Sequence, residues 1–302
     1  MLYLIAASLL WSFSFGIIKS SLAALDPGFV GWARLLLSAA VFAPLVGREA
    51  LAERGLAARL LAIGAVQYGL MYSLYLAAYA HLAAHQIALF TVFTPIYVVL
   101  WDGLRRRQLS PVAVGCAALA IAGAALLRDP ASARADLLVG FALVQGANLS
   151  FAAGQIEYRR LRRARPELRD RRLHGLVLAG GLAVTALTTT LRGGWGSFAA
   201  LDRGSVAALA YLGVVASGLG FFLWNAGAVR TRPATLAVLN NLKIPLGVAV
   251  ALVLFGEATD LPRLVAGGGV MLLAALVAER WGEAPADADA AAPAGADDPK
   301  RP

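Results

Sequence analysis

The sequence consists largely of apolar runs that are long enough to cross a lipid bilayer, which takes about 20 residues in a helix. Apolar residues make up 59% of the 302 residues and charged residues only 15%. Soluble domains carry roughly a quarter charged residues. In lipid, a helix lets such a run satisfy its own backbone hydrogen bonds. The sequence therefore predicts an all-α polytopic membrane protein with ten transmembrane helices, at residues 2–22, 28–46, 60–82, 86–101, 111–127, 137–157, 173–191, 205–229, 233–255 and 262–281.

The basic residues are distributed unevenly between the predicted loops. The net charge is +9, and arginines gather between alternate spans, at 48–59, 105–107, 159–172 and 230–232. Because loops rich in lysine and arginine stay on the cytoplasmic side of a membrane, both termini are predicted to be cytoplasmic. The tail, residues 282–302, lacks apolar periodicity and is predicted to be a disordered cytoplasmic segment.

The two halves of the chain share local patterns. Thr94-Pro95 in the fourth span corresponds to Ile244-Pro245 in the ninth, and both prolines are predicted to break their helices. Five spans per half is an odd number, so the second half must enter the membrane inverted. Inverted repeats with interrupted helices are typical of secondary transporters, which bind their solute between the repeats. We predict a first five-helix repeat at 1–130 and a second at 131–281.

The most unusual polar cluster lies inside the ninth span. Asn240, Asn241 and Lys243 stand within the apolar run 233–255, just before Pro245. A lysine near the middle of a span costs on the order of 2.5–3.5 kcal/mol on insertion scales. Such groups are tolerated where protein or a water-filled cavity supplies partners. We interpret the cluster as one wall of a solute site; the alternative is a polar contact between packed helices.

Other spans carry polar or aromatic stripes. Tyr68, Tyr72, Tyr75 and Tyr79 follow steps of four, three and four residues, which places them on one helical face. One such stripe alone could be a contact between helices. Stripes on six spans together favour a polar central cavity. The candidate substrate-binding residues are Trp11, Tyr68, Tyr72, Tyr75, Thr91, Gln145, Asn148, Trp224, Asn240, Asn241 and Lys243.

The charges predicted to lie within the membrane are positive. Arg34 in the second span and Lys19 near the end of the first are candidates for anion binding or gating. The alternative is that their long side chains reach the membrane surface. Asp102, Glu157 and Glu257 fall at the ends of spans and are predicted to face solvent. A cationic interior favours a carboxylate-bearing solute.

No motif of another function class is evident. The sequence has no nucleophile elbow, no zinc-protease motif and no phosphate-binding loop. We therefore predict no enzyme activity, no catalytic residues, no metal site and no cofactor. The predicted partners are a small-molecule substrate and the lipid bilayer, without nucleic acid. The oligomeric state is left open.

Short motifs along nearly the whole chain are shared with one group of transporters. The general ones are Trp11 with Lys19, Arg34, the Pro95 and Pro245 helices, and Gly256-Glu257. More specific are the stretches 10–15, 89–95, Gln145 with Asn148, Phe151-Ala152, 213–220 running into Trp224-Asn225, and Thr235-Leu236 before Asn240-Asn241. These motifs resemble the drug/metabolite transporter superfamily, specifically the ten-helix transporters with two EamA repeats.

Within that superfamily, the specific motifs resemble the bacterial carboxylate/amino acid/amine branch, and most closely its high-affinity biotin importers. The resemblance implies a bacterial inner (plasma) membrane transporter that works by alternating access and takes up biotin or a similar amphipathic carboxylate. Lys243 departs from the importers, where a histidine is expected. Export of amino acids or related metabolites is the alternative, and the exact substrate, the direction and the coupling ion are left open.

Overall fold

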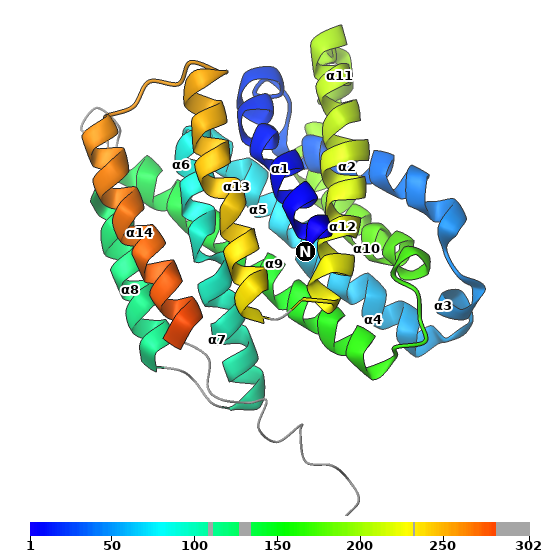
Figure 1. Cartoon of the computed structure of the whole chain (residues 1–302). Coiled ribbons are helices and arrows are strands. Elements are labelled where there is room, and N and C mark those ends of the chain that lie inside the picture. Colours follow the sequence, from blue (N-terminus) through cyan, green and yellow to red (C-terminus); the bar gives the residue numbers. More distant parts are fainter. Residues whose placement is uncertain (108–110, 127–133, 232, 282–302) are drawn as a thin grey trace, which may run out of the picture.

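The computed structural model describes residues 1–107, 111–126, 134–231 and 233–281, and within these ranges it is helical without a strand (Figure 1). The predicted disordered tail lies outside the described residues. Two short segments, η2 and η6, are π-helical, and the other η segments are 3₁₀ turns. The elements are α1 (Leu2–Ser21), α2 (Pro27–Phe42), η1 (Ala43–Leu45), α3 (Arg48–Ala52), α4 (Arg54–Gly64), η2 (Ala65–Leu70), α5 (Met71–Ala77), η3 (Ala78–Ala80), α6 (Ala84–Phe90), η4 (Thr91–Phe93), α7 (Thr94–Arg106), α8 (Pro111–Leu126), α9 (Arg134–Ala164), α10 (Asp170–Arg192), η5 (Gly194–Ala200), α11 (Arg203–Ala210), η6 (Tyr211–Leu219), α12 (Gly220–Val229), α13 (Pro233–Val253) and α14 (Leu261–Trp281).

Eight helical segments of the described chain are long and apolar enough to cross a membrane. They coincide with eight of the predicted spans. The other two predicted spans contain shorter apolar helices, Val114–Gly123 and Leu239–Val253. The chain is therefore an all-helical, multi-pass membrane protein, while the count of ten crossings stays a prediction.

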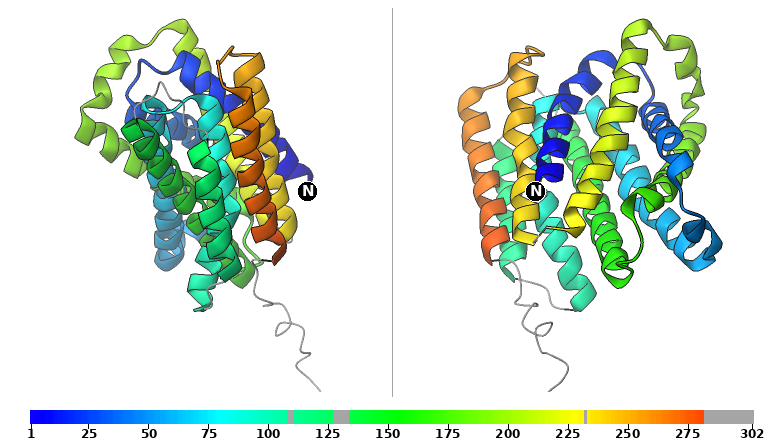
Figure 2. Two further views of the ribbon diagram at one scale, coloured as in Figure 1. Left: turned by 90° about the vertical axis from the view of Figure 1, so that its left-hand side faces the viewer. Right: turned by 45° about the vertical axis from the view of Figure 1, so that its right-hand side comes forward.

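Helices that are distant in the sequence pack against each other. α1 packs against α13, α2 against α10, and α8 against α14 (Figure 1). In the turned views the helices run side by side as one bundle (Figure 2). Segments from the first and second halves of the chain are therefore direct neighbours, which allows both halves to contribute to a central site.

Two of the long helical segments contain a π-helical stretch in their middle. One is η2 between α4 and α5, and the other is η6 between α11 and α12. In η6 the Ser217 hydroxyl donates to the carbonyl oxygen of Leu212, five residues earlier, at 2.6 Å. Such stretches often occur at functional sites, because the wider turn redirects nearby side chains.

The two prolines affect their helices differently. Pro95 is the second residue of α7, and the 3₁₀ turn η4 directly precedes that helix, so the α-helix is interrupted there. Pro245 lies inside α13, which continues through it, so the predicted break is absent. A proline removes one backbone donor, but the packing of α13 against α1 and α6 holds the remaining turns in place.

A buried carboxylate joins three helices at one end of the bundle. We call this the arginine-rich end; α7, α9 and α12 end there and α4 begins there, at the bottom of Figure 1. Asp170 accepts hydrogen bonds from the Tyr158 hydroxyl at 2.9 Å and from Arg162 Nε at 2.8 Å. Arg230 Nη2 lies 3.1 Å from its other oxygen. The cluster ties the ends of α9 and α12 to the start of α10.

A second carboxylate closes the opposite end. Glu257, in the loop between α13 and α14, accepts hydrogen bonds from the backbone N–H groups of Ala84 and His85, at 2.8 and 2.9 Å. Its oxygen also lies 2.7 Å from His85 Nδ1. Its side chain is 15% exposed, so the prediction that Glu257 faces solvent is wrong. Burial alone would raise the pKa of Glu257, but these hydrogen bonds outweigh it and hold the pKa below its ordinary value.

Candidate functional site

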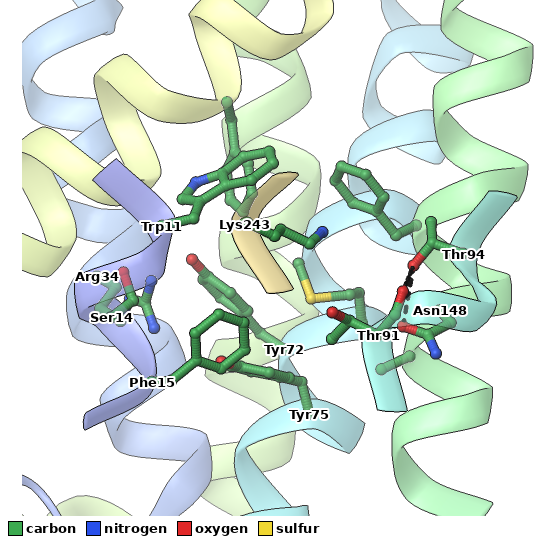
Figure 3. A pocket seen from close by; sticks show the side chains of 14 residues that line it. Trp11, Ser14, Phe15, Arg34, Tyr72, Tyr75, Thr91, Thr94, Asn148 and Lys243 are labelled. Carbon is green, nitrogen blue, oxygen red and sulfur yellow. Dashed lines mark hydrogen bonds between the residues drawn. The ribbon is translucent and has the colours of Figure 1, made fainter. Parts of the chain in front are cut away.

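A cavity with an empty volume of about 580 Å³ lies between helices of both halves of the chain (Figure 3). The cavity is lined by Trp11, Ser14 and Phe15 of α1, Arg34 of α2, Met71, Tyr72 and Tyr75 of α5, Thr91 of η4, Thr94 of α7, Ala147, Asn148 and Phe151 of α9, Phe221 of α12, and Lys243 of α13.

Lys243 brings one positive charge to this cavity. Its side chain is buried, and its Nζ donates to Asn240 Oδ1 at 3.1 Å. The same Nζ lies 5.2 Å from the ring centre of Trp11 and 5.9 Å from that of Phe151. The negative faces of these rings partly compensate the charge. Asn240 is one turn before Lys243 on α13, which explains how the two side chains meet.

Arg34 brings a second positive charge. It is only 2% exposed, and its Nε donates to the Ser217 hydroxyl at 3.1 Å. The guanidinium carbon lies 4.5 Å from the ring centre of Tyr72. Ser217 also lies 2.7 Å from the Tyr72 hydroxyl. Because Ser217 donates its own proton to Leu212, it accepts from both Arg34 and Tyr72 and fixes the two side chains in place.

No carboxylate lines the cavity among the residues that the structure describes. Within the same ranges, no ion pair joins Arg34 or Lys243 to an acidic residue. Two buried cations without a carboxylate are costly, since buried charges are normally paired. The electrostatics of the cavity therefore suit a negatively charged ligand.

Aromatic rings form the apolar part of the wall. Trp11 contacts Phe221 at a ring-centre distance of 5.6 Å, and Phe15 contacts Tyr75 at 6.3 Å. The Trp11 Nε1 donates to the carbonyl oxygen of Ala216 at 2.8 Å. Gly220 makes this approach feasible, because a Cβ there would lie 2.8 Å from Trp11 Nε1. The wall can thus hold an apolar body against ordered rings.

Hydroxyl and amide groups form another part of the wall, where α9 meets α7. Thr94 Oγ1 lies 3.2 Å from Asn148 Oδ1 and 2.8 Å from the carbonyl oxygen of Thr91. The Asn148 amide donates to the carbonyl oxygen of Phe90 at 2.9 Å and to Gln145 Oε1 at 3.1 Å. The interruption of the helix before Pro95 leaves these carbonyl groups available to side chains.

The predicted site residues divide into two groups. The structure brings together at the cavity Trp11, Tyr72, Tyr75, Thr91, Asn148, Lys243 and Arg34. The other predicted residues do not line it. They are Tyr68, Gln145, Trp224, Asn240, Asn241 and Lys19.

Most residues of the second group support the wall from behind. The Trp224 indole donates to Gln155 Oε1 at 2.8 Å, and the Tyr68 hydroxyl accepts from Asn225 at 2.8 Å. Gln145 accepts from Asn148, and Asn240 from Lys243. Trp224 also packs on Trp11, with ring centres 5.2 Å apart, and Tyr68 stacks on Phe221 at 4.3 Å, so these side chains position lining residues.

Lys19 and Asn241 lie apart from the cavity wall. Lys19 Nζ donates to the backbone carbonyl oxygens of Tyr79 and Leu82, at 2.8 and 3.2 Å, so it ties α1 to the end of the third long helical segment. Both amide atoms of Asn241 are buried without a hydrogen-bond partner in the described part of the chain.

Sequence reasoning did not include several lining residues among its candidates. Met71, Phe151 and Phe221 are apolar, and in a membrane sequence an apolar side chain at a cavity looks the same as one that packs on a helix. Ser14 and Thr94 are polar. Ser14-Phe15 recurs as Ser150-Phe151 in the second half, and Thr94-Pro95 corresponds to Ile244-Pro245. This correspondence between the halves is the sequence signal that could have identified Ser14 and Thr94 as lining residues.

Comparisons with known proteins agree with this architecture. Residues 1–128 match the EamA-like transporter family. The chain is 37% identical over 285 residues to the "Probable biotin transporter" of Pseudomonas aeruginosa, covering 93% of this chain and 96% of the relative. It is 34% identical to the "Biotin transporter" of Salmonella typhimurium and 33% identical to that of Escherichia coli K12, each over 93% of both chains.

A solved structure supports the fold. This structure, described only as the crystal structure of a protein, matches with a TM-score of 0.61 at 21% identity, over 92% of this chain and 95% of the other. The chain thus combines apolar helices, a cavity shared by both halves, and sequence identity to these relatives over 93% of its length. The chain belongs to the EamA-like transporter family, within the drug/metabolite transporter superfamily.

Proposed function

We propose that this protein is a secondary transporter that takes up biotin, or a similar amphipathic carboxylate, across the bacterial inner membrane. The observation that carries the proposal is the composition of the cavity: Arg34 and Lys243 face it, and no carboxylate lines it in the described ranges. A solute with one carboxylate would supply the missing negative charge.

The chemistry of biotin fits the cationic, hydrogen-bonding and aromatic parts of the cavity wall. Its carboxylate suits a cationic group, its ureido ring can exchange hydrogen bonds with Thr94 and Asn148, and its apolar body can lie on Trp11 and Phe221. Relatives that align over nearly their full length are named biotin transporters. These names support the same solute.

Alternating access between two inverted repeats, residues 1–130 and 131–281, would move this solute. The two π-helical stretches, η2 and η6, support this division, because each lies in the middle of one 27-residue apolar segment, Arg54–Ala80 or Arg203–Val229. In a rocking mechanism the site stays near the middle while the two ends open in turn. We place the arginine-rich end and both termini in the cytoplasm.

Export of amino acids is the alternative function. An amino acid also carries an ammonium group, which is usually bound by a carboxylate or by several acceptors. Because the described lining contains no carboxylate, the cavity fits a solute without a positive charge better.

The test is uptake of labelled biotin by a bacterial strain that can neither make nor import biotin, with and without this chain. We expect saturable uptake that excess unlabelled biotin abolishes. If correctly inserted, well-expressed protein gives no uptake, the biotin proposal is wrong. Release of labelled amino acids from preloaded cells would then test the export alternative.

A further inference from the structure

The two cations of the cavity differ in their surroundings. Arginine carries five N–H donors in a planar fork. Nε of Arg34 donates to the Ser217 hydroxyl, whereas Nη1 is buried without a hydrogen-bond partner among the described residues. Lys243 instead already donates to Asn240 and lies over two aromatic rings. The Arg34 guanidinium is thus the less satisfied of the two groups.

A second unsatisfied donor belongs to the wall of the same cavity. The Ser14 hydroxyl is buried, lines the same cavity and has no hydrogen-bond partner in the described ranges. Figure 3 shows Ser14 and Arg34 together on one side of the cavity. Thr91, Thr94 and Asn148 lie on the other side, and the Lys243 amine points into the space between. The cavity therefore has two polar ends.

The geometry points to a division of the substrate between these ends. We propose that Arg34 and Ser14 bind the carboxylate, and that Lys243 binds the carbonyl oxygen at the opposite end of the same solute. The inference rests on the proposed function and assigns the orientation of the substrate within the site.

The physical argument is the match between donors and acceptors. A carboxylate accepts paired hydrogen bonds from the fork of an arginine, and this pairing fixes both partners in one plane. Ser217 and Tyr72 already hold Arg34 in position, so little conformational freedom remains to be lost on binding. Lysine presents a compact point charge, which places no such demand on the shape of its acceptor.

The experiment measures the Kd values of three ligands for the purified full-length protein, from their dose-dependent stabilisation against heat. The ligands are biotin, biotin amide, which lacks the carboxylate charge, and iminobiotin. In iminobiotin a guanidine group, protonated at neutral pH, places a cationic donor where biotin has its ureido carbonyl oxygen. For the wild type we expect biotin amide and iminobiotin to bind about 10- to 100-fold more weakly than biotin, the loss typical of one charged hydrogen bond.

Each cation should control the preference for biotin over the analogue that is altered at the end which that cation binds. In Arg34→Gln the Kd ratio of biotin amide to biotin should fall to about 1, while iminobiotin stays the weaker ligand. In Lys243→Met the Kd ratio of biotin amide to biotin (the amide ratio) should persist. The preference for biotin over the cationic iminobiotin should fall several-fold, because no lysine then faces that end. Arg192→Gln, an exposed arginine paired with Asp26, is the matched control and should keep both ratios.

The reverse pattern, with the amide ratio kept in Arg34→Gln and lost in Lys243→Met, would overturn the assignment. If Arg34→Gln does not fold, Ser14→Ala and Arg34→Lys take its place. Each should lower the amide ratio by several-fold, and an unchanged ratio in both would also overturn it. Failure of the proposed function is distinct, because then the wild type itself binds none of the three ligands, and the inference falls with it.

Discussion

Two buried charged regions of this molecule differ in how their charges are paired. At the arginine-rich end, Asp170 is surrounded by Tyr158, Arg162 and Arg230, and every contact joins a donor to a carboxylate oxygen. In the central cavity, Arg34 and Lys243 have only neutral partners among the described residues. Both regions bury charge, but only the first pairs its cations with a carboxylate of the chain, whose Oδ2 contacts Arg230 without a hydrogen bond.

This difference separates a structural role from a binding role. A buried ion pair whose members are all satisfied connects helices, and removal of one member leaves the others uncompensated. A buried cation without a counter-ion costs stability, and in membrane proteins such residues typically mark solute or ion pathways. The predictions below test whether the two regions respond to substitution in these two ways.

The substitution Asp170→Ala should have the largest effect on folding. It leaves the buried Arg162 without its carboxylate and Tyr158 without its acceptor, so we expect a loss of about 3–5 kcal/mol in the free energy of unfolding. Membrane abundance and the thermal unfolding of detergent-purified protein measure it. An unchanged unfolding temperature would contradict the structural role of this cluster.

The substitution Lys243→Met should have the opposite profile, with biotin uptake abolished and abundance maintained. Methionine keeps an unbranched side chain and removes a buried charge, so folding loses little, while the solute loses a charged hydrogen bond worth about 1.5–3 kcal/mol. Uptake normalised to the membrane abundance of the protein separates the two effects. Normal uptake by this variant would refute a role of Lys243 in binding the solute.

The substitution Ser217→Ala should weaken uptake without abolishing it. Arg34 and Tyr72 would lose their shared acceptor, so the guanidinium would be less well positioned. A hydrogen bond of about 1 kcal/mol corresponds to a roughly fivefold higher half-saturation concentration. Ser150→Ala is the matched control, because Ser150 donates to Gly146 within its own helix. Equal effects of the two substitutions would argue against positioning by Ser217.

Glu257 lies outside the spans, and its hydrogen-bonded carboxylate allows a test of how folding stability depends on pH. Because its folded pKa lies below the ordinary 4.5, its contribution to stability is present above that pH and is lost as the pH falls through the folded pKa. The stability difference between wild type and Glu257→Gln should therefore be constant at neutral pH and shrink in acid. A difference that stays constant throughout the acid range would contradict this account.

The exposed pair of Arg165 with Glu53 should contribute least. Hydrogen bonds at 3.0 Å connect these side chains at the arginine-rich end, but both are open to solvent. Solvent and salt screen such pairs. Arg165→Gln should leave the unfolding temperature and uptake within experimental error. A marked loss of folding would show that this end depends on its surface charges as well as on Asp170.

The sequence predicted the helical membrane fold and a large part of the cavity wall. Bilayer-length apolar runs permit few folds, and a lysine such as Lys243 in the middle of one run needs a partner at that depth. It did not predict which polar residues point inward. Tyr68 and Tyr72 share a helical face, yet only Tyr72 lines the cavity, whereas Tyr68 bonds to Asn225. Glu257 looked like a solvent-facing loop residue but is bound to the start of α6.

What the sequence determined by itself is the class of the protein and the positive sign of the charged side chains at its cavity, because both depend on composition along single helices. The tertiary structure decided which charges meet and which remain unpaired. Arg34 and Ser217 are 183 residues apart, and only the packing of α2 against η6 brings them together. Contacts between distant helices depend on how their surfaces fit, and this information is spread over many residues of both partners.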